Sequence, residues 1–152
     1  MKTEIEVSGK TLQLTRVFNA PRPLVFAWWT SAEKLEQWFG CKGMTSCHIE
    51  MDFRVGGSFR QTMQIEGVGE FSSSAVYEEI VEPERIVYVA DFGMATTRVT
   101  VEFFEQGSQT RLVITHDGVP GEPFVKNVSQ GTVEALEKLD ELLSREVLTH
   151  QI

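Results

Sequence analysis

Residues 124–148 read FVKNVSQGTVEALEKLDELLSREVL, and this stretch decides the fold. Apolar or small side chains recur there at steps of three and four residues, which is the period of an α-helix. The stripe is Val125, Val128, Thr132, Ala135, Leu139 and Leu142, widened by Leu136 and Leu143. Pro123 suits the first turn because a helix leaves its first N–H groups unpaired. Such a helix is roughly 35 Å long at ~1.5 Å per residue, so it needs a broad apolar surface opposite it.

Residues 44–117 supply that surface, because apolar and polar side chains alternate there with the period of β-strands. About six strands follow one another through short turns rich in glycine, such as Gly56-Gly57 and Gly107-Ser108. Successive strands joined by short turns favour a meandering antiparallel sheet. The predicted core includes Phe18, Val25, Trp29, Ile49, Ile86, Val101, Ile114, Leu136 and Leu139.

The first forty residues add a strand region and two short helices. Residues 3–18 alternate, and Ser8-Gly9-Lys10 makes them either a hairpin or one long interrupted strand. Pro21 opens a short helix through Trp29, and Thr30 with Glu33 reads as the capping box of a second, ending near Trp38 or Phe39. The whole order predicts an α+β helix-grip fold, in which a curved antiparallel sheet wraps a long C-terminal helix. A curved sheet cannot touch a straight helix along its whole length, so a pocket is expected between them.

Composition limits the class of partner. The chain has 152 residues and a net charge of −8, which predicts a single domain over residues 1–152. No cluster of Lys and Arg falls on a predicted face, so we expect neither nucleic acid nor a membrane surface as a partner. Cys41 and Cys47 favour free thiols in a reducing, cytoplasmic compartment, although their spacing leaves a disulfide open. That spacing matches no usual zinc pattern, and we expect no metal and no cofactor.

Several motifs resemble those of one family. They are RVFNAP at 16–21, LEQWFG at 35–40, DFRVGGSFR at 52–60, EIVEPERIVY at 79–88 and GTVEALEKL at 131–139. Together they resemble proteins similar to the C-terminal domain of the activator of heat-shock protein 90 ATPase, within the START-like or SRPBCC superfamily. The resemblance implies the helix-grip fold and a scaffold with varied ligands. Thr132 departs from the family, which usually has Trp after the glycine of the last motif.

The favoured hypothesis is a binding module for a small apolar or amphipathic molecule, working as a monomer or homodimer. The cavity is predicted to be lined by Phe26, Trp29, Trp38, Met63, Tyr88, Phe103, His116, Val128, Thr132 and Leu136. Adjacent helix residues point about 100° apart. We therefore expect one residue of the pair Trp28-Trp29, and one of Trp38-Phe39, to be available to a ligand or partner.

Two other hypotheses come from different classes. An enzyme of the cyclase or hydrolase kind needs converging polar groups, and His116 with Asp91 or Glu70 is the best set the sequence offers. His116 shares a strand face with Leu112 and Ile114, although a structural, hydrogen-bonded histidine is the commoner outcome. The family name also implies a stress-related co-chaperone acting on a heat-shock ATPase. Arg16, on an apolar strand face, either pairs with a carboxylate or binds an anionic ligand.

Overall fold

The computed structural model describes residues 2–40 and 43–150, with side chains as far as residue 147. Its elements are β1 (Glu4–Ser8), β2 (Thr11–Phe18), α1 (Arg22–Ala27), α2 (Ala32–Leu35), β3 (Met44–Met51), β4 (Ser58–Ile65), β5 (Gly69–Val81), β6 (Arg85–Asp91), β7 (Thr96–Gln106), β8 (Gln109–Asp117) and α3 (Phe124–His150). None of the helices within these residues is long and apolar enough to cross a membrane.

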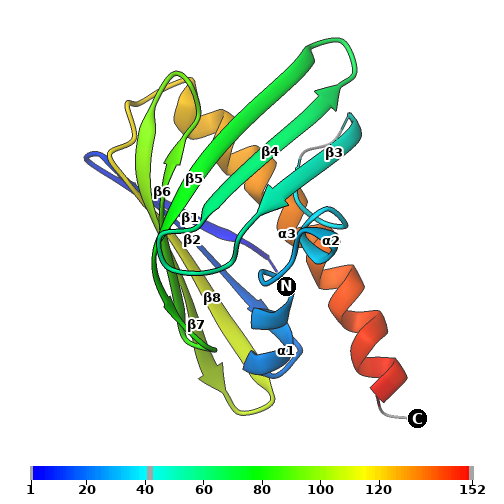
Figure 1. Cartoon of the computed structure of the whole chain (residues 1–152). Helices are drawn as coiled ribbons and strands as arrows, with labels where there is room; N and C mark the ends of the chain where they lie inside the picture. Colours follow the sequence, from blue (N-terminus) through cyan, green and yellow to red (C-terminus); the bar gives the residue numbers. More distant parts are fainter. Residues whose placement is uncertain (1, 41–42, 151–152) are drawn as a thin grey trace.

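The strands form one antiparallel sheet in the order β1-β2-β8-β7-β6-β5-β4-β3. Residues 4–18 make a hairpin whose second strand pairs with β8, which puts β1 at one edge of the sheet and β3 at the other. Figure 1 shows the sheet curving around α3. A register shift between Tyr77 and Glu79 on β5 adds a bend, as β-bulges do. This architecture confirms the predicted α+β helix-grip fold.

The short helices differ from the prediction at their ends. The N-cap of α2 is Ser31, whose hydroxyl accepts a hydrogen bond from the Lys34 N–H at 3.3 Å. The predicted cap, Thr30, instead donates its hydroxyl to the Ala27 carbonyl at 2.7 Å. The capping-box prediction was therefore wrong by one residue, because the Thr30 side chain bonds back to a carbonyl at the end of α1. Both helices also end earlier than expected, at Ala27 and Leu35.

The long helix begins at Phe124, where the predicted stretch begins, and ends at His150, two residues beyond it. Pro123 precedes α3, and its carbonyl accepts the Asn127 N–H at 3.0 Å. The buried residues of α3 are Phe124, Val125, Ser129, Ala135, Leu136, Leu139 and Leu143. Val128, Thr132 and Leu142, which the predicted stripe contained, are half-buried. The face that meets the sheet is thus turned toward Leu136 and Leu143.

Two hydrophobic clusters fill the interior. We call the first the aromatic cluster; its members include Phe18, Phe26, Trp29, Trp38, Phe103, Leu136, Leu139 and Leu143. We call the second the aliphatic cluster; its buried members are Leu12, Leu14, Val119, Phe124 and Val125. Every residue of the predicted core is buried. The C-terminal half of α3 packs on the aromatic cluster, and its N-terminal turns pack on the aliphatic cluster through Phe124, Val125, Val128 and Val133.

Candidate ligand site between the sheet and the long helix

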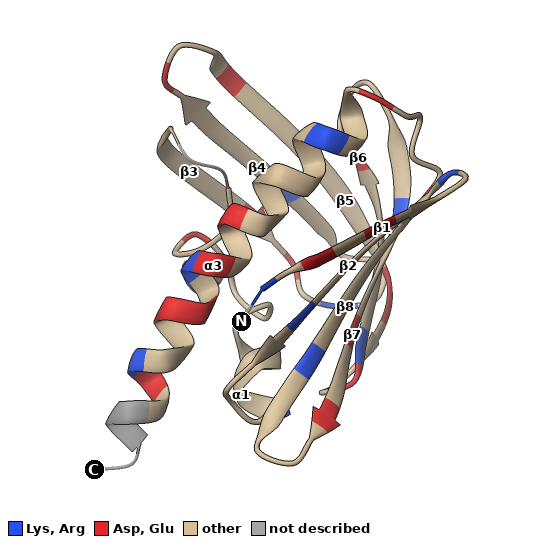
Figure 2. Ribbon diagram, turned by 180° about the vertical axis from the view of Figure 1, so that it is seen from behind, with Lys and Arg blue, Asp and Glu red and all other residues tan. Residues whose placement is uncertain are grey.

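A lateral row of side chains crosses the inner face of the sheet. Tyr77 on β5 lies opposite Tyr88 on β6, which lies opposite Val99 on β7, which lies opposite His116 on β8. Directly opposed residues of an antiparallel sheet project from the same face. Figure 2 shows α3 crossing the open side of this sheet, with β3 to β5 on one side and β1 and β2 on the other. The row therefore faces the helix.

His116 is buried at 5 % exposure between the two clusters, because its strand neighbours are Leu12 of the aliphatic cluster and Val99 of the aromatic cluster. Its Nδ1 lies 3.2 Å from the Thr97 hydroxyl, with which it shares a hydrogen bond. Burial lowers the pKa of His116 to about 4, against a smaller opposing effect of Asp117. The imidazole is therefore neutral at neutral pH. Its Nε2 makes no hydrogen bond to a described residue.

The two tyrosines of the row stand edge to face, with ring centroids 6.1 Å apart. Burial raises the pKa of Tyr88 to about 12 and raises the pKa of Tyr77 as well. Both phenols therefore keep their protons at neutral pH. Within the part of the chain that the structure describes, neither hydroxyl has a hydrogen-bond partner. The row thus carries two donors that the protein itself leaves unused.

The helix carries a buried hydroxyl on the stretch between the two clusters. Ser129 is only 7 % exposed, and its Oγ is covered yet has no hydrogen-bond partner among the described residues. It follows Val125 of the aliphatic cluster by one turn and precedes Leu136 of the aromatic cluster by two, on the same helix face. Thr132, half-buried, comes next on that face. The side of α3 between the clusters is therefore lined by hydroxyl groups.

Three further polar side chains, at the β3 to β5 end of the inner face, form hydrogen bonds with one another. The Ser73 hydroxyl donates to Gln61 Oε1 at 3.2 Å, and Gln61 Nε2 donates to Cys47 Sγ at 3.7 Å. Burial is the main cause that raises the pKa of the Cys47 thiol. Cys47 is free, whereas Cys41 lies outside the described residues. This trio needs no ligand to complete its hydrogen bonds.

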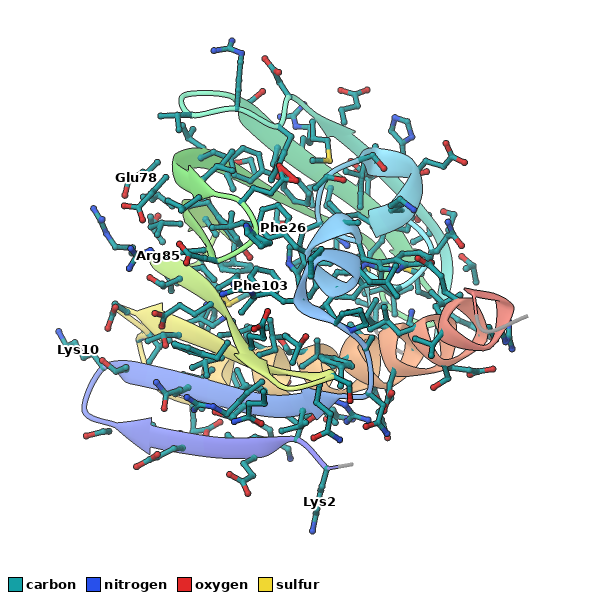
Figure 3. The ribbon with its side chains drawn as sticks, turned by 90° about the horizontal axis from the view of Figure 1, so that it is seen from below. Lys2, Lys10, Phe26, Glu78, Arg85 and Phe103 are labelled. Atoms are coloured by element: carbon teal, nitrogen blue, oxygen red, sulfur yellow. The ribbon has the colours of Figure 1, made fainter. Side chains whose placement is uncertain are left out.

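The structure places the predicted cavity residues in different parts of the interior. Phe26, Trp29, Trp38, Phe103 and Leu136 all belong to the aromatic cluster. Figure 3 shows Phe26 and Phe103 together inside the fold, where their ring centroids are 5.1 Å apart. Tyr88 packs at the edge of that cluster, Val128 packs against the aliphatic one, and Met63 is buried outside both.

Of the predicted set, Tyr88, His116 and Thr132 are the residues that bring polar atoms to the inner face. Sequence reasoning missed Ser129 and Tyr77. Ser129 stands four residues after Val125 and three before Thr132, a spacing that marks the core stripe. Its neighbour Val128 was assigned to the stripe instead because it is apolar. Tyr77 lies within the predicted strand region 44–117, and its pairing with Tyr88 shows which face of the sheet it occupies.

The prediction that one residue of each aromatic pair is available was wrong for the tryptophans. Trp28 and Trp29 are each 6 % exposed. Trp28 lies just after α1, where the chain turns, so both indoles reach the interior. The Trp28 carbonyl accepts the Trp38 Nε1–H at 3.1 Å, and the Lys34 ammonium lies 4.6 Å above the Trp28 ring. Phe39 is half-buried and packs on Trp38.

The acids considered for an enzyme do not converge with His116. Asp91 lies opposite Ser74, which alternates with the buried Ala75, so Asp91 projects from the outer face of the sheet. Its Oδ1 accepts the Gly93 N–H at 2.8 Å. Glu70 is exposed, and its Oε1 accepts a hydrogen bond from Gln64 at 3.2 Å. The proposed pairing of His116 with Asp91 or Glu70 is therefore contradicted.

An open hollow of about 800 Å³ lies on this outer face, away from α3. Its outward-facing lining is Glu50, Asp52, Ser58, Arg60, Ser74, Val76, Val89, Asp91 and Thr96. The lining is mixed in charge and exposed, so it differs in kind from the covered inner face.

Arg16 was expected either to pair with a carboxylate or to bind an anionic ligand, and the structure shows the first. Its Nη2 lies 2.7 Å from Asp140 Oδ2, and its Nη1 donates to the Thr3 hydroxyl at 3.0 Å. The residue is 6 % exposed. It therefore pairs with a carboxylate at the boundary of β2 and α3.

Comparison with known proteins gives the same fold. The sequence model of the family described as "Activator of Hsp90 ATPase homolog 1-like protein" matches residues 19–144. A crystallised protein from Chromobacterium violaceum is 26% identical with a TM-score of 0.81, covering 88% of this chain and 96% of that one. A protein from Rhizobium leguminosarum is 28% identical with a TM-score of 0.77, covering 95% and 99%. CalU16 from Micromonospora echinospora shares the fold at 20% identity, with a TM-score of 0.73, covering 98% of this chain and 90% of that one. No protein of curated function matches.

Proposed function

The chain belongs to the family of Activator of Hsp90 ATPase homolog 1-like proteins, and we propose that it binds a small apolar or amphipathic molecule between the sheet and α3. One observation carries the proposal: the Ser129 hydroxyl is covered but has no partner among the described residues. Leaving a buried hydroxyl unpaired costs about 1–3 kcal/mol. A bound molecule that accepts or donates one hydrogen bond here removes that cost.

The surroundings suit an amphipathic molecule. The aromatic cluster on one side and the aliphatic cluster on the other offer apolar surface to the body of a ligand. Tyr77, Tyr88 and His116 offer polar atoms between them. In this proposal Phe26, Trp29, Trp38, Phe103 and Leu136 form a rigid apolar wall, and Met63, Val128 and Thr132 complete the boundary.

Native mass spectrometry of freshly purified protein tests the proposal. We expect a retained small molecule that is released on denaturation and whose occupancy falls in Ser129→Ala and His116→Ala. Ser144→Ala is the matched control, because Ser144 is an exposed hydroxyl of the same helix that bonds the Asp140 carbonyl. Arg60→Ala controls for the outer hollow. If the adduct is lost in Arg60→Ala and kept in Ser129→Ala, the ligand lies on the other face and the proposal is wrong.

The family supports a ligand-binding or co-chaperone-like role in general. The co-chaperone alternative rests on the family description alone, and stimulation of an Hsp90-type ATPase by the purified chain would favour it. For either role we propose a cytoplasmic location, because Cys41 and Cys47 are the only cysteines.

A further inference from the structure

We propose that the molecule bound between the sheet and α3 is electrically neutral and places a carbonyl, ester or similar acceptor oxygen against Tyr77, Tyr88 and Ser129. This inference rests on the function proposed above and narrows its ligand to one chemical class. Fatty acid anions and alkylammonium ions are excluded from that class. Three features of the described residues lead to it: the charges of the interior, the kind of polar atom on offer, and the apolar surface on both sides.

The interior has no free counter-ion for a charged ligand. Among the described residues that are buried, Arg16 is the one that carries a charge at neutral pH. Its Nη1 and Nη2 are engaged by Thr3 and Asp140, and although its Nε has no partner, the Asp140 carboxylate already balances its charge. Taking an unpaired charge out of water costs several kcal/mol, so an ionised ligand is selected against.

The hydroxyls of Tyr77, Tyr88 and Ser129 are unpaired polar groups that carry no charge, whereas Arg16 Nε is an unpaired atom of a charged group whose carboxylate partner is Asp140. The Tyr77 and Tyr88 phenols are protonated at neutral pH, and they face α3 side by side. The Ser129 hydroxyl lies on the facing stretch of the helix between the clusters. Hydroxyl groups donate readily to a carbonyl oxygen without requiring a charge. The complementary ligand group is therefore a neutral acceptor.

Apolar surface flanks this donor set on both sides. Ile86, Val101 and Ile114 form the adjoining lateral row of the sheet on one side, and all three are buried. Phe92 lies on the other side, with its ring centroid 5.3 Å from that of Phe124. The acceptor oxygen of the ligand is thus expected within an apolar skeleton rather than at a hydrated end.

Lys138 offers the main competing arrangement. It is half-buried on α3, and its charge is near enough to act on the Cys47 thiol. A carboxylate placed there could keep its chain inside and its head group at the rim, as long amphipathic groups often do. The experiment must therefore separate a neutral acceptor inside from an anion at the rim.

Titration calorimetry with methyl decanoate, decanoate and decylammonium makes that separation, because the three share one chain length and differ in charge. At neutral pH we expect the ester to bind at least about tenfold more tightly than either ion. Tyr88→Phe and Ser129→Ala, which keep the shape of the site, should each weaken the ester several-fold. Ser144→Ala and Lys138→Gln should leave it unchanged.

Two results would overturn the inference while leaving ligand binding itself in place. One is an ion that binds as tightly as the ester, and the other is decanoate binding that disappears in Lys138→Gln. If no probe binds and native mass spectrometry finds no retained molecule, the proposed function fails instead. Circular dichroism of each variant establishes that it is folded.

Discussion

The guanidinium of Arg16 on β2 holds the carboxylate of Asp140 on α3, with Nη2 and Oδ2 2.7 Å apart. Arg16 is buried, Asp140 is about a quarter exposed, and the contact joins the long helix to the second strand of the sheet. The same guanidinium bonds Thr3, just before β1. One side chain thus connects the N-terminal hairpin with the helix that closes over the sheet.

Removing the partner of Arg16 should destabilise the fold. Asp140→Ala leaves a buried guanidinium without its carboxylate, and we expect a loss of roughly 1–3 kcal/mol in the free energy of unfolding. Urea denaturation measures it. Glu141→Ala is the neighbouring control, because Glu141 pairs with Arg145 on the exposed side of the helix, where ion pairs contribute at most about 1 kcal/mol. Equal losses of unfolding free energy in the two variants would show that the buried ion pair stabilises the fold no more than the exposed one.

The register of α3 is tested by truncating two leucines. Leu139 is fully buried in the aromatic cluster, so Leu139→Ala should cost about 2–5 kcal/mol through lost burial and the cavity left behind. Leu142 is half-buried, and Leu142→Ala should cost clearly less. Thermal and chemical unfolding of both variants gives the comparison. A larger loss for Leu142 than for Leu139 would contradict the described face.

The burial of His116 predicts a specific dependence of stability on pH. Its pKa falls from 6.5 to about 4 on folding, so between these values the unfolded chain binds a proton that the native state does not. The unfolded state then gains stability as the pH falls, and about 3 kcal/mol of native stability is lost between pH 6.5 and pH 4. His116→Gln should lack this component.

The measurement for His116 is the difference between two curves of unfolding free energy against pH, one for each protein. Carboxylates titrate in the same range, but they do so in both proteins and cancel in the difference. Parallel curves would mean that folding does not lower the pKa of His116.

Thr132→Trp tests whether there is unfilled space beneath α3. Thr132 is half-buried on the face that follows Ser129. If space is present, the indole should fill it with a near-neutral or stabilising effect, whereas a packed site would lose roughly 1–3 kcal/mol by overpacking. Uptake of methyl decanoate should also be blocked. A sharp drop in melting temperature would show a full site, and unchanged uptake would place the ligand elsewhere.

The helices and strands themselves follow from local patterns in the sequence. The period of residues 124–148 predicts α3 and the burial of Leu136 and Leu139, since a helix presents one face to whatever covers it. Alternation along β8 places Leu112, Ile114 and His116 on one face for the same kind of reason. Such patterns depend on backbone geometry alone, which is why they can be found without knowing the neighbours.

The ends of the short helices depend on competing local hydrogen bonds. Thr30 and Ser31 can each cap a helix, and the choice of Ser31 depends on the carbonyl of Ala27, which the Thr30 hydroxyl can reach. The burial of both Trp28 and Trp29 has a related cause, because after α1 the chain tightens into turns with hydrogen bonds three residues apart, such as Trp29 N–H to the Phe26 carbonyl. Helical spacing therefore gave the wrong expectation at that point.

The sequence by itself determined the class of fold, the faces of most strands and the family. Only the tertiary structure decided which polar groups meet. Strand register sets Tyr77 beside Tyr88 and puts Asp91 on the outer face, and helix packing leaves the Ser129 hydroxyl covered and unpaired. These relations join residues far apart in the chain, and a local pattern shows which face a side chain occupies but not what lies opposite it.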